Sequence, residues 1–145
     1  MHKTTKITCL MLASIWLAAQ FTVAAPAGEN KYLGKWSGTY AGQNASGHID
    51  MSLERGREGV ITGTVMVTAN PGQGFDYTAK FKSASFDGAK FTAIYDPRGD
   101  GQTEITLKGV FDPKTAAGDW SMTAKAQPTG EPVAAGTWTI ARNRI

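Results

Sequence analysis

An alternation of apolar and polar residues with a period of two constrains the fold of this chain most strongly. Ile49, Met51 and Leu53 alternate with polar neighbours, and the segment 75–81 repeats the pattern. Successive side chains of a β-strand point to opposite faces, so each segment has one buried face and one solvent-exposed face. No segment after Ala27 places apolar residues at helical spacing over three turns. We therefore expect an all-β domain.

The same phase marks eight segments as strands. The segments between them carry turn residues, as in Asn70-Pro71-Gly72-Gln73-Gly74, and most are short enough to join neighbouring strands as hairpins. The residues expected to face inward are Trp36, Gly38 and Tyr40; Ile49, Met51 and Leu53; Ile61, Gly63, Val65 and Val67; Phe75, Tyr77, Ala79 and Phe81; Phe91, Ala93 and Tyr95; Ile105, Leu107, Gly109 and Phe111; Gly118, Trp120 and Met122; Gly136, Trp138 and Ile140.

Eight sequential antiparallel strands can form an open sheet, a sandwich or a closed barrel. We expect an up-and-down barrel, because closure removes exposed edges and lets one inner face supply the whole core. Inward glycines support this choice, since a missing side chain lets a strand bend or makes room for an aromatic ring. The outward positions carry Lys, Asp, Glu and Thr in place of the apolar band of an outer-membrane barrel.

Residues 1–27 have the pattern of a secretory signal peptide. Lys3 and Lys6 precede an apolar stretch over 7–19, and Ala25-Pro26-Ala27 supplies the small residues that a signal peptidase reads. Cleavage after Ala25 would leave proline at the first mature position, so we place the cleavage after Ala27. An uncleaved anchor is the alternative, but Gln20 interrupts the apolar stretch.

The expected organisation is a signal-peptide helix over 1–27 followed by one barrel domain over 28–145. Removal of the signal takes away Cys9, the only cysteine, and leaves 13 Lys+Arg (15 less Lys3 and Lys6) against 12 Asp+Glu. No basic tract then remains to bind nucleic acid. Export without cysteines is ordinary in bacteria. We expect a periplasmic or extracellular protein that has no membrane span after processing.

The chain has few residues suited to catalysis or metal binding. His48 is the only histidine after the signal, and its phase points outward, so neither a zinc site nor a buried catalytic triad is expected. The segment 96–104 partly matches a calcium loop, but Arg98 occupies a ligand position and Leu107 stands where the closing Glu belongs. We predict no catalytic residue, no metal and no cofactor, and a function other than catalysis.

A short repeat marks the last two predicted strands. Ala116-Ala117-Gly118-Asp119-Trp120-Ser121-Met122 and Ala134-Ala135-Gly136-Thr137-Trp138-Thr139-Ile140 match in register and are expected to form one hairpin. With Gly34-Lys35-Trp36 they give three Gly-x-Trp units. Filling a barrel end against glycine-thinned backbone is the favoured role of any one of these tryptophans, and stacking on a ligand is the alternative.

Two motifs carry a resemblance to the calycins, the broad group that holds lipocalins and avidins. Gly34-Lys35-Trp36 resembles the Gly-x-Trp of their first strand, and Gly59-Val60-Ile61-Thr62-Gly63-Thr64 resembles the Gly-x-Leu-Thr-Gly-Thr run of avidin-like proteins. The resemblance covers the first third of the mature chain. Avidins continue with a ligand-contacting tyrosine where this chain has Val65, so biotin binding is not implied. The resemblance implies a barrel of a kind that commonly holds a small, largely apolar molecule.

These observations predict a binding protein that holds a small apolar ligand in one mouth of the barrel, because an eight-stranded barrel can spare room for one ligand. A protein-interaction module or inhibitor with a packed core, acting on another envelope protein, is the first alternative. A barrel isomerase that uses a buried tyrosine or a bound water is the second. The candidate ligand-binding residues are Trp36, Tyr40, Tyr77, Tyr95, Trp120 and Trp138.

Overall fold

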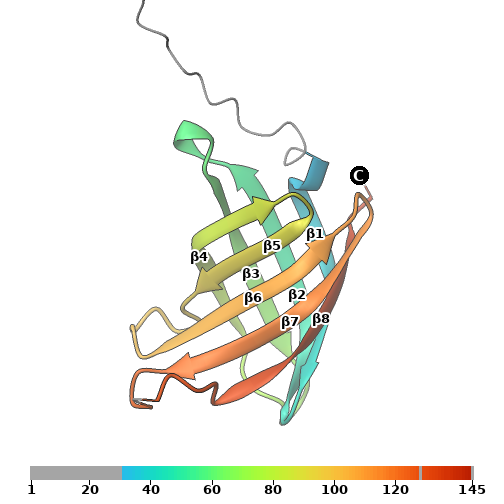
Figure 1. Ribbon diagram of the computed structural model, residues 1–145. Helices are drawn as coiled ribbons and strands as arrows, with labels where there is room; N and C mark the ends of the chain where they lie inside the picture. Colours follow the sequence, from blue (N-terminus) through green and yellow to red (C-terminus); the bar gives the residue numbers. More distant parts are fainter. Residues whose placement is uncertain (1–30, 128, 145) are drawn as a thin grey trace, which may run out of the picture.

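The computed structural model describes residues 31–127 and 129–144, so the predicted signal peptide, residues 1–27, lies outside the described residues. Eight antiparallel strands close into a barrel in the order of the sequence, with β1 paired to both β2 and β8 (Figure 1). The predicted eight-stranded up-and-down barrel is confirmed. The strands are β1 (Gly34–Gly42), β2 (Ala45–Arg55), β3 (Ile61–Ala69), β4 (Tyr77–Asp87), β5 (Lys90–Tyr95), β6 (Thr103–Phe111), β7 (Thr115–Ala124) and β8 (Ala134–Arg142), and a short 3-10 helix, η2 (Arg57–Gly59), links β2 to β3.

The alternation read from the sequence places the core inside the barrel. The burial pattern of β2 and β3 alternates between buried and more exposed residues over most of their length, and Val65 and Leu53 are almost fully buried. Outward residues such as His48 are exposed. Across 31–127 and 129–144, no helix is both long and apolar enough to cross a membrane.

One end of the barrel is filled by aromatic rings. Tyr32, Trp36, Phe86, Phe91 and Phe111 are buried there, and neighbouring ring centroids lie 4.9–5.7 Å apart. The indole N–H of Trp36 donates a hydrogen bond to the carbonyl oxygen of Tyr32 at 3.0 Å. Edge-to-face and tilted ring pairs of this kind add to the energy of apolar burial. This end, which we call the closed end, lies near the carboxyl terminus in Figure 1.

Strand β4 differs from its prediction at both ends. Phe75 was expected to face inward from this strand, but β4 begins at Tyr77, so Phe75, which is 42% exposed, lies in the loop at the mouth of the barrel. The reason is local: Gly74 has a φ of +124°, and the Asp76 carboxylate accepts a hydrogen bond from the backbone N–H of Ala69 at 2.9 Å. These features hold the chain in a loop until Tyr77.

At its other end β4 continues beyond the predicted segment 75–81 as far as Asp87. An irregularity in its pairing with β5 falls between Phe81 and Ser83, and the buried positions then change from odd to even numbers, at Ala84 and Phe86. A β-bulge inserts one residue in this way and shifts the phase that follows it. The bulge therefore brings the Phe86 ring into the closed end.

The Gly-x-Trp units of the repeat face each other. In the pairing of β7 with β8, Gly118 lies opposite Trp138, and Gly136 lies opposite Trp120. A Cβ added at Gly136 would stand 2.6 Å from the indole nitrogen of Trp120, and one added at Gly109 would stand 2.5 Å from the ring of Trp138. These two inward glycines therefore make room for aromatic rings, which was one of their two expected roles.

Arg142 binds the segment 31–33, which precedes β1, at the closed end. Its guanidinium donates hydrogen bonds to the carbonyl oxygens of Pro113 at 2.9 Å and Leu33 at 2.6 Å, and also to that of Lys31. The same group lies 4.5 Å from the centroid of the Trp36 ring. A planar guanidinium can donate up to five hydrogen bonds in its plane while its face stacks on a ring, whereas an ammonium group has only three donors and no flat face.

Arg142→Lys is therefore expected to lower the free energy of unfolding by about 1–2 kcal/mol, because most of these hydrogen bonds are lost while the charge is kept. Urea unfolding at neutral pH measures the change. Arg144→Lys, at an exposed position two residues away, should change it by less than about 0.5 kcal/mol. Equal effects of the two substitutions would contradict this role of Arg142.

Candidate functional site

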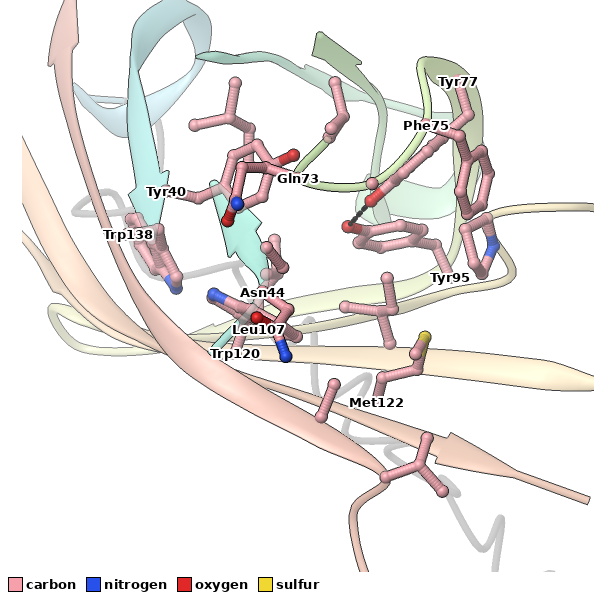
Figure 2. A pocket seen from close by; sticks show the side chains of 18 of the residues that line it. Tyr40, Asn44, Gln73, Phe75, Tyr77, Tyr95, Leu107, Trp120, Met122 and Trp138 are labelled. Carbon is pink, nitrogen blue, oxygen red and sulfur yellow. Dashed lines mark hydrogen bonds between the residues drawn. The ribbon is translucent and has the colours of Figure 1, made fainter. Parts of the chain in front are cut away.

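The other end of the barrel is hollow. A cavity of about 370 Å³ opens there, among the loops that follow β1, β3, β5 and β7 (Figure 2). Tyr40, Ile49, Val67, Tyr77, Tyr95, Ile105, Leu107, Trp120, Met122 and Trp138 form its walls, and the rim residues are Gln43, Asn44, Ala45, Gln73, Gly74, Phe75, Pro97, Val133 and Ala134. We call this end the open end. Protein interiors contain few voids larger than a water molecule, so a cavity of this size is a specific feature of the fold.

The two tryptophans of the repeat give the cavity apolar walls. The indole N–H of Trp120 donates to the carbonyl oxygen of Ala41 at 3.2 Å, and that of Trp138 donates to the carbonyl oxygen of Asp119 at 3.0 Å. Because both N–H groups already have backbone partners, the rings present chiefly their carbon surfaces to the cavity. Trp138 is 1% exposed and Trp120 is 8% exposed, so both rings are held firmly in place.

Two tyrosine hydroxyls meet in the wall of the cavity. Tyr77 in β4 and Tyr95 in β5 place their hydroxyl oxygens 2.9 Å apart, as the dashed line in Figure 2 shows. Burial raises the pKa of Tyr77 to about 12, an effect that its hydrogen bond with Tyr95 partly offsets. Burial also raises the pKa of Tyr95 well above its ordinary value. Both hydroxyls are therefore neutral at physiological pH and can donate hydrogen bonds.

Tyr40 supplies a third hydroxyl on the opposite side of the cavity in Figure 2. Its ring meets Trp120 edge-on, with the centroids 6.4 Å apart. Burial and then the negative charge of Asp76 raise the pKa of Tyr40. The negative charge of Asp76 therefore acts on Tyr40 at the open end, although Asp76 does not itself line the cavity.

The buried tyrosine pair predicts a stability that falls at alkaline pH. Tyrosines of the unfolded chain ionise near pH 10, whereas Tyr77 has a pKa of about 12 and that of Tyr95 is well above the ordinary value. Above pH 10 the unfolded state therefore binds fewer protons than the folded state, and the free energy of unfolding decreases as the pH rises towards 12. Urea unfolding between pH 9 and about 12 measures the decrease. The double variant Tyr77→Phe/Tyr95→Phe should show a shallower decrease, and an unchanged slope would contradict the prediction.

Five of the six predicted ligand-binding residues line the cavity: Tyr40, Tyr77, Tyr95, Trp120 and Trp138. Trp36 does not, because it lies at the closed end, fully buried, with its ring 4.9 Å from that of Phe111. Trp36 and Tyr40 share a face of β1, but four residues of a strand span about 13 Å. The shared phase therefore identifies the inner face of the barrel but not the end at which a residue lies.

The rim of the cavity comes from loop residues that strand periodicity does not identify. Gln43, Asn44 and Gln73 place side-chain amides there, and Phe75 and Val133 are each 42% exposed. Asn44 has a φ of +57° in the two-residue turn between β1 and β2, a conformation that asparagine tolerates better than most residues. That turn chemistry is the one signal in the sequence that marks this part of the rim.

His48 and Asp96, two polar side chains outside the cavity, have local structural partners. The Nε2 atom of His48 lies 3.2 Å from a carboxylate oxygen of Asp50, on the outer face. The Asp96 carboxylate accepts hydrogen bonds from the backbone N–H group of Gly101 and from those of Arg98 and Gly99, which lower its pKa. Asp96 therefore caps its own turn. In the part of the chain that the structure describes, no three His, Cys, Asp or Glu side chains are grouped to hold a metal ion.

No protein-family model matches this chain, and no curated protein matches it. The closed meander of eight antiparallel strands is consistent with a calycin-like fold. The functional argument therefore depends on the cavity and its lining residues.

Proposed function

We propose that this protein is a non-enzymatic binding protein, exported to the periplasm or the cell exterior, that holds a small, largely apolar ligand in the open end of its barrel. The cavity of about 370 Å³ carries the proposal. Ligand pockets have volumes of about 300–1,000 Å³, with mostly apolar walls and a few polar groups that fix orientation. The tryptophan rings and the tyrosine hydroxyls fit that description. A lipocalin-like mode of binding is part of the proposal.

The two alternative functions predicted from the sequence, an interaction module and a barrel isomerase, fit the structure less well. An interaction module was expected to have a packed core, but the rings fill only the closed end. A barrel isomerase would use a buried tyrosine, and the neutral Tyr77 and Tyr95 hydroxyls suit hydrogen-bond donation better than proton abstraction. Proton NMR of a ligand recovered after incubation separates binding from isomerisation, because an isomer has the same mass but a different spectrum, and a binding protein returns the ligand unchanged.

The proposal is tested by titrating the purified protein with N-phenylnaphthylamine, a neutral apolar fluorescent probe. We expect one site per chain, quenching of tryptophan fluorescence, and a stability gain of about 2.7 kcal/mol at a probe concentration of 100 Kd. Screening native lipid extracts for the same stability gain extends the test to natural ligands.

Two matched variants locate the site. Ala134 lines the cavity and Ala135, the next residue of β8, is exposed. Ala134→Trp should fill the cavity and weaken probe binding at least roughly tenfold, whereas Ala135→Trp should leave binding unchanged. Absence of binding by any apolar probe, or equal binding by the two variants, would overturn the proposal.

A further inference from the structure

The described lining of the cavity carries no charged side chain. Of the described residues that line it, none is an Asp, Glu, Lys, Arg or His. Arg98 lies close by, with its guanidinium 4.5 Å from the centroid of the Phe75 ring, but it does not belong to the lining. A charged group that enters such a cavity loses its hydration and gains no counter-ion from the described lining. The lining therefore disfavours ligands whose buried part carries a charge.

The tyrosine pair offers the cavity one hydrogen-bond donor. A phenolic hydroxyl has one proton to donate and two lone pairs. In the 2.9 Å contact between Tyr77 and Tyr95, one hydroxyl donates to the other, so one proton stays free for a third group. Within the described part of the chain, neither hydroxyl has another hydrogen-bond partner. A ligand that carries a hydrogen-bond acceptor would therefore complete this pair.

The remaining lining favours flat rings. Trp120, Trp138, Tyr40 and Phe75 surround the cavity together with aliphatic side chains (Figure 2). Aromatic rings pack well against one another in offset or edge-on arrangements. An unsaturated ring of the ligand would meet such surfaces on more than one side, while a flexible alkyl chain would lose more conformational freedom on binding.

We infer that the ligand is a neutral, ring-containing molecule with a carbonyl-type acceptor, and that the Tyr77–Tyr95 hydroxyl pair donates a hydrogen bond to this acceptor. The inference rests on the proposed function and specifies the ligand class of the same cavity. It separates ketones, aldehydes and esters from fatty-acid anions, whose carboxylate would have no cationic partner among the described lining residues.

Four naphthalene derivatives of nearly equal size test the ligand class. They are 2-acetylnaphthalene, its isosteric alkene 2-isopropenylnaphthalene, the anion 2-naphthoate and the cation 1-(2-naphthyl)ethylammonium. We expect the ketone to bind roughly fivefold more tightly than the alkene, because the alkene cannot accept the hydrogen bond. The two ions should bind at least about tenfold more weakly than the alkene.

The hydroxyl pair is tested with the double variant Tyr77→Phe/Tyr95→Phe, because a single substitution would leave the remaining hydroxyl free to donate. Replacing both partners of a hydrogen bond by apolar groups is nearly neutral for stability, so the double variant should fold. It should bind ketone and alkene equally. Tyr32→Phe, at the closed end, should retain the preference for the ketone.

The outcomes separate the two proposals. Equal affinity of the ketone and the alkene for the unaltered protein, tightest binding of either ion, or a ketone preference that survives in the double variant would each overturn the assigned ligand class. The proposed binding function would stand in these cases. Failure of all four compounds and of N-phenylnaphthylamine to bind would overturn both.

Discussion

Replacement of Trp36 by alanine is expected to lower the free energy of unfolding by about 3–5 kcal/mol, the range for loss of a large aromatic side chain from a core. Trp36 is 0% exposed, contacts the ring of Phe111 and donates a hydrogen bond to Tyr32. Its removal would leave a void in the closed end, which the surrounding rings cannot fill without moving. It would also remove the ring on which Arg142 stacks.

Urea unfolding measures the loss, with Val110→Ala as the control. Val110 is 57% exposed, so its truncation should change stability by about 0.5 kcal/mol or less. If Trp36→Ala lost less than about 1 kcal/mol, the closed end would not be the packed core described above. The same variant tests the separation of the closed end from the open end. Because Trp36 does not line the cavity, the folded fraction of Trp36→Ala should still bind the apolar probe.

The second large effect is expected at Gly136, where alanine should lower the free energy of unfolding by about 3 kcal/mol or more. A Cβ there would stand 1.9 Å from the carbonyl oxygen of Ala41 and 2.6 Å from the indole nitrogen of Trp120. The carbonyl belongs to the β1 backbone and cannot move without disturbing the closure of the barrel between β1 and β8. The crowding would also disturb the Trp120 wall of the cavity.

Gly88→Ala is the matched control for this substitution. Gly88 has a φ of +60° and nothing within 4 Å of an added Cβ, so only backbone strain opposes alanine there. Its cost should be about 1–2 kcal/mol. Comparable losses at Gly88 and Gly136 in thermal or urea unfolding would show that crowding at Gly136 is absent.

The architecture could be predicted from the sequence because strand phase is a local property. Alternation at Ile49, Met51 and Leu53 identifies an inward face without knowledge of the neighbouring strands, and the turn residues mark where each strand ends. The phase change at Phe81 could not be predicted in this way, since two consecutive polar residues, Lys82 and Ser83, look like the end of a strand. Only the pairing with β5 shows that β4 continues through a bulge.

The position of a residue along the barrel axis could not be predicted either. Trp36 and Trp138 have the same Gly-x-Trp context and the same inward phase, yet one fills the closed end and the other lines the cavity. Depth depends on the register of all eight strands and on the size of the side chains that meet at each level. Phe86, which the bulge turns inward, and Tyr32, which precedes β1, complete the filled end, and neither was among the residues expected to face inward.

The most direct test of the ligand cavity is a methyl chemical-shift map of the protein with and without 2-acetylnaphthalene. We expect shifts at methyl groups of the cavity lining, such as Ile49, Ile105 and Leu107, and none at Leu53 or Ile61, which are buried in the barrel but do not line the cavity. Shifts confined to exposed Val60 and Val110 on the outside of the barrel, or no shifts at saturating ligand, would contradict a binding site in the open end.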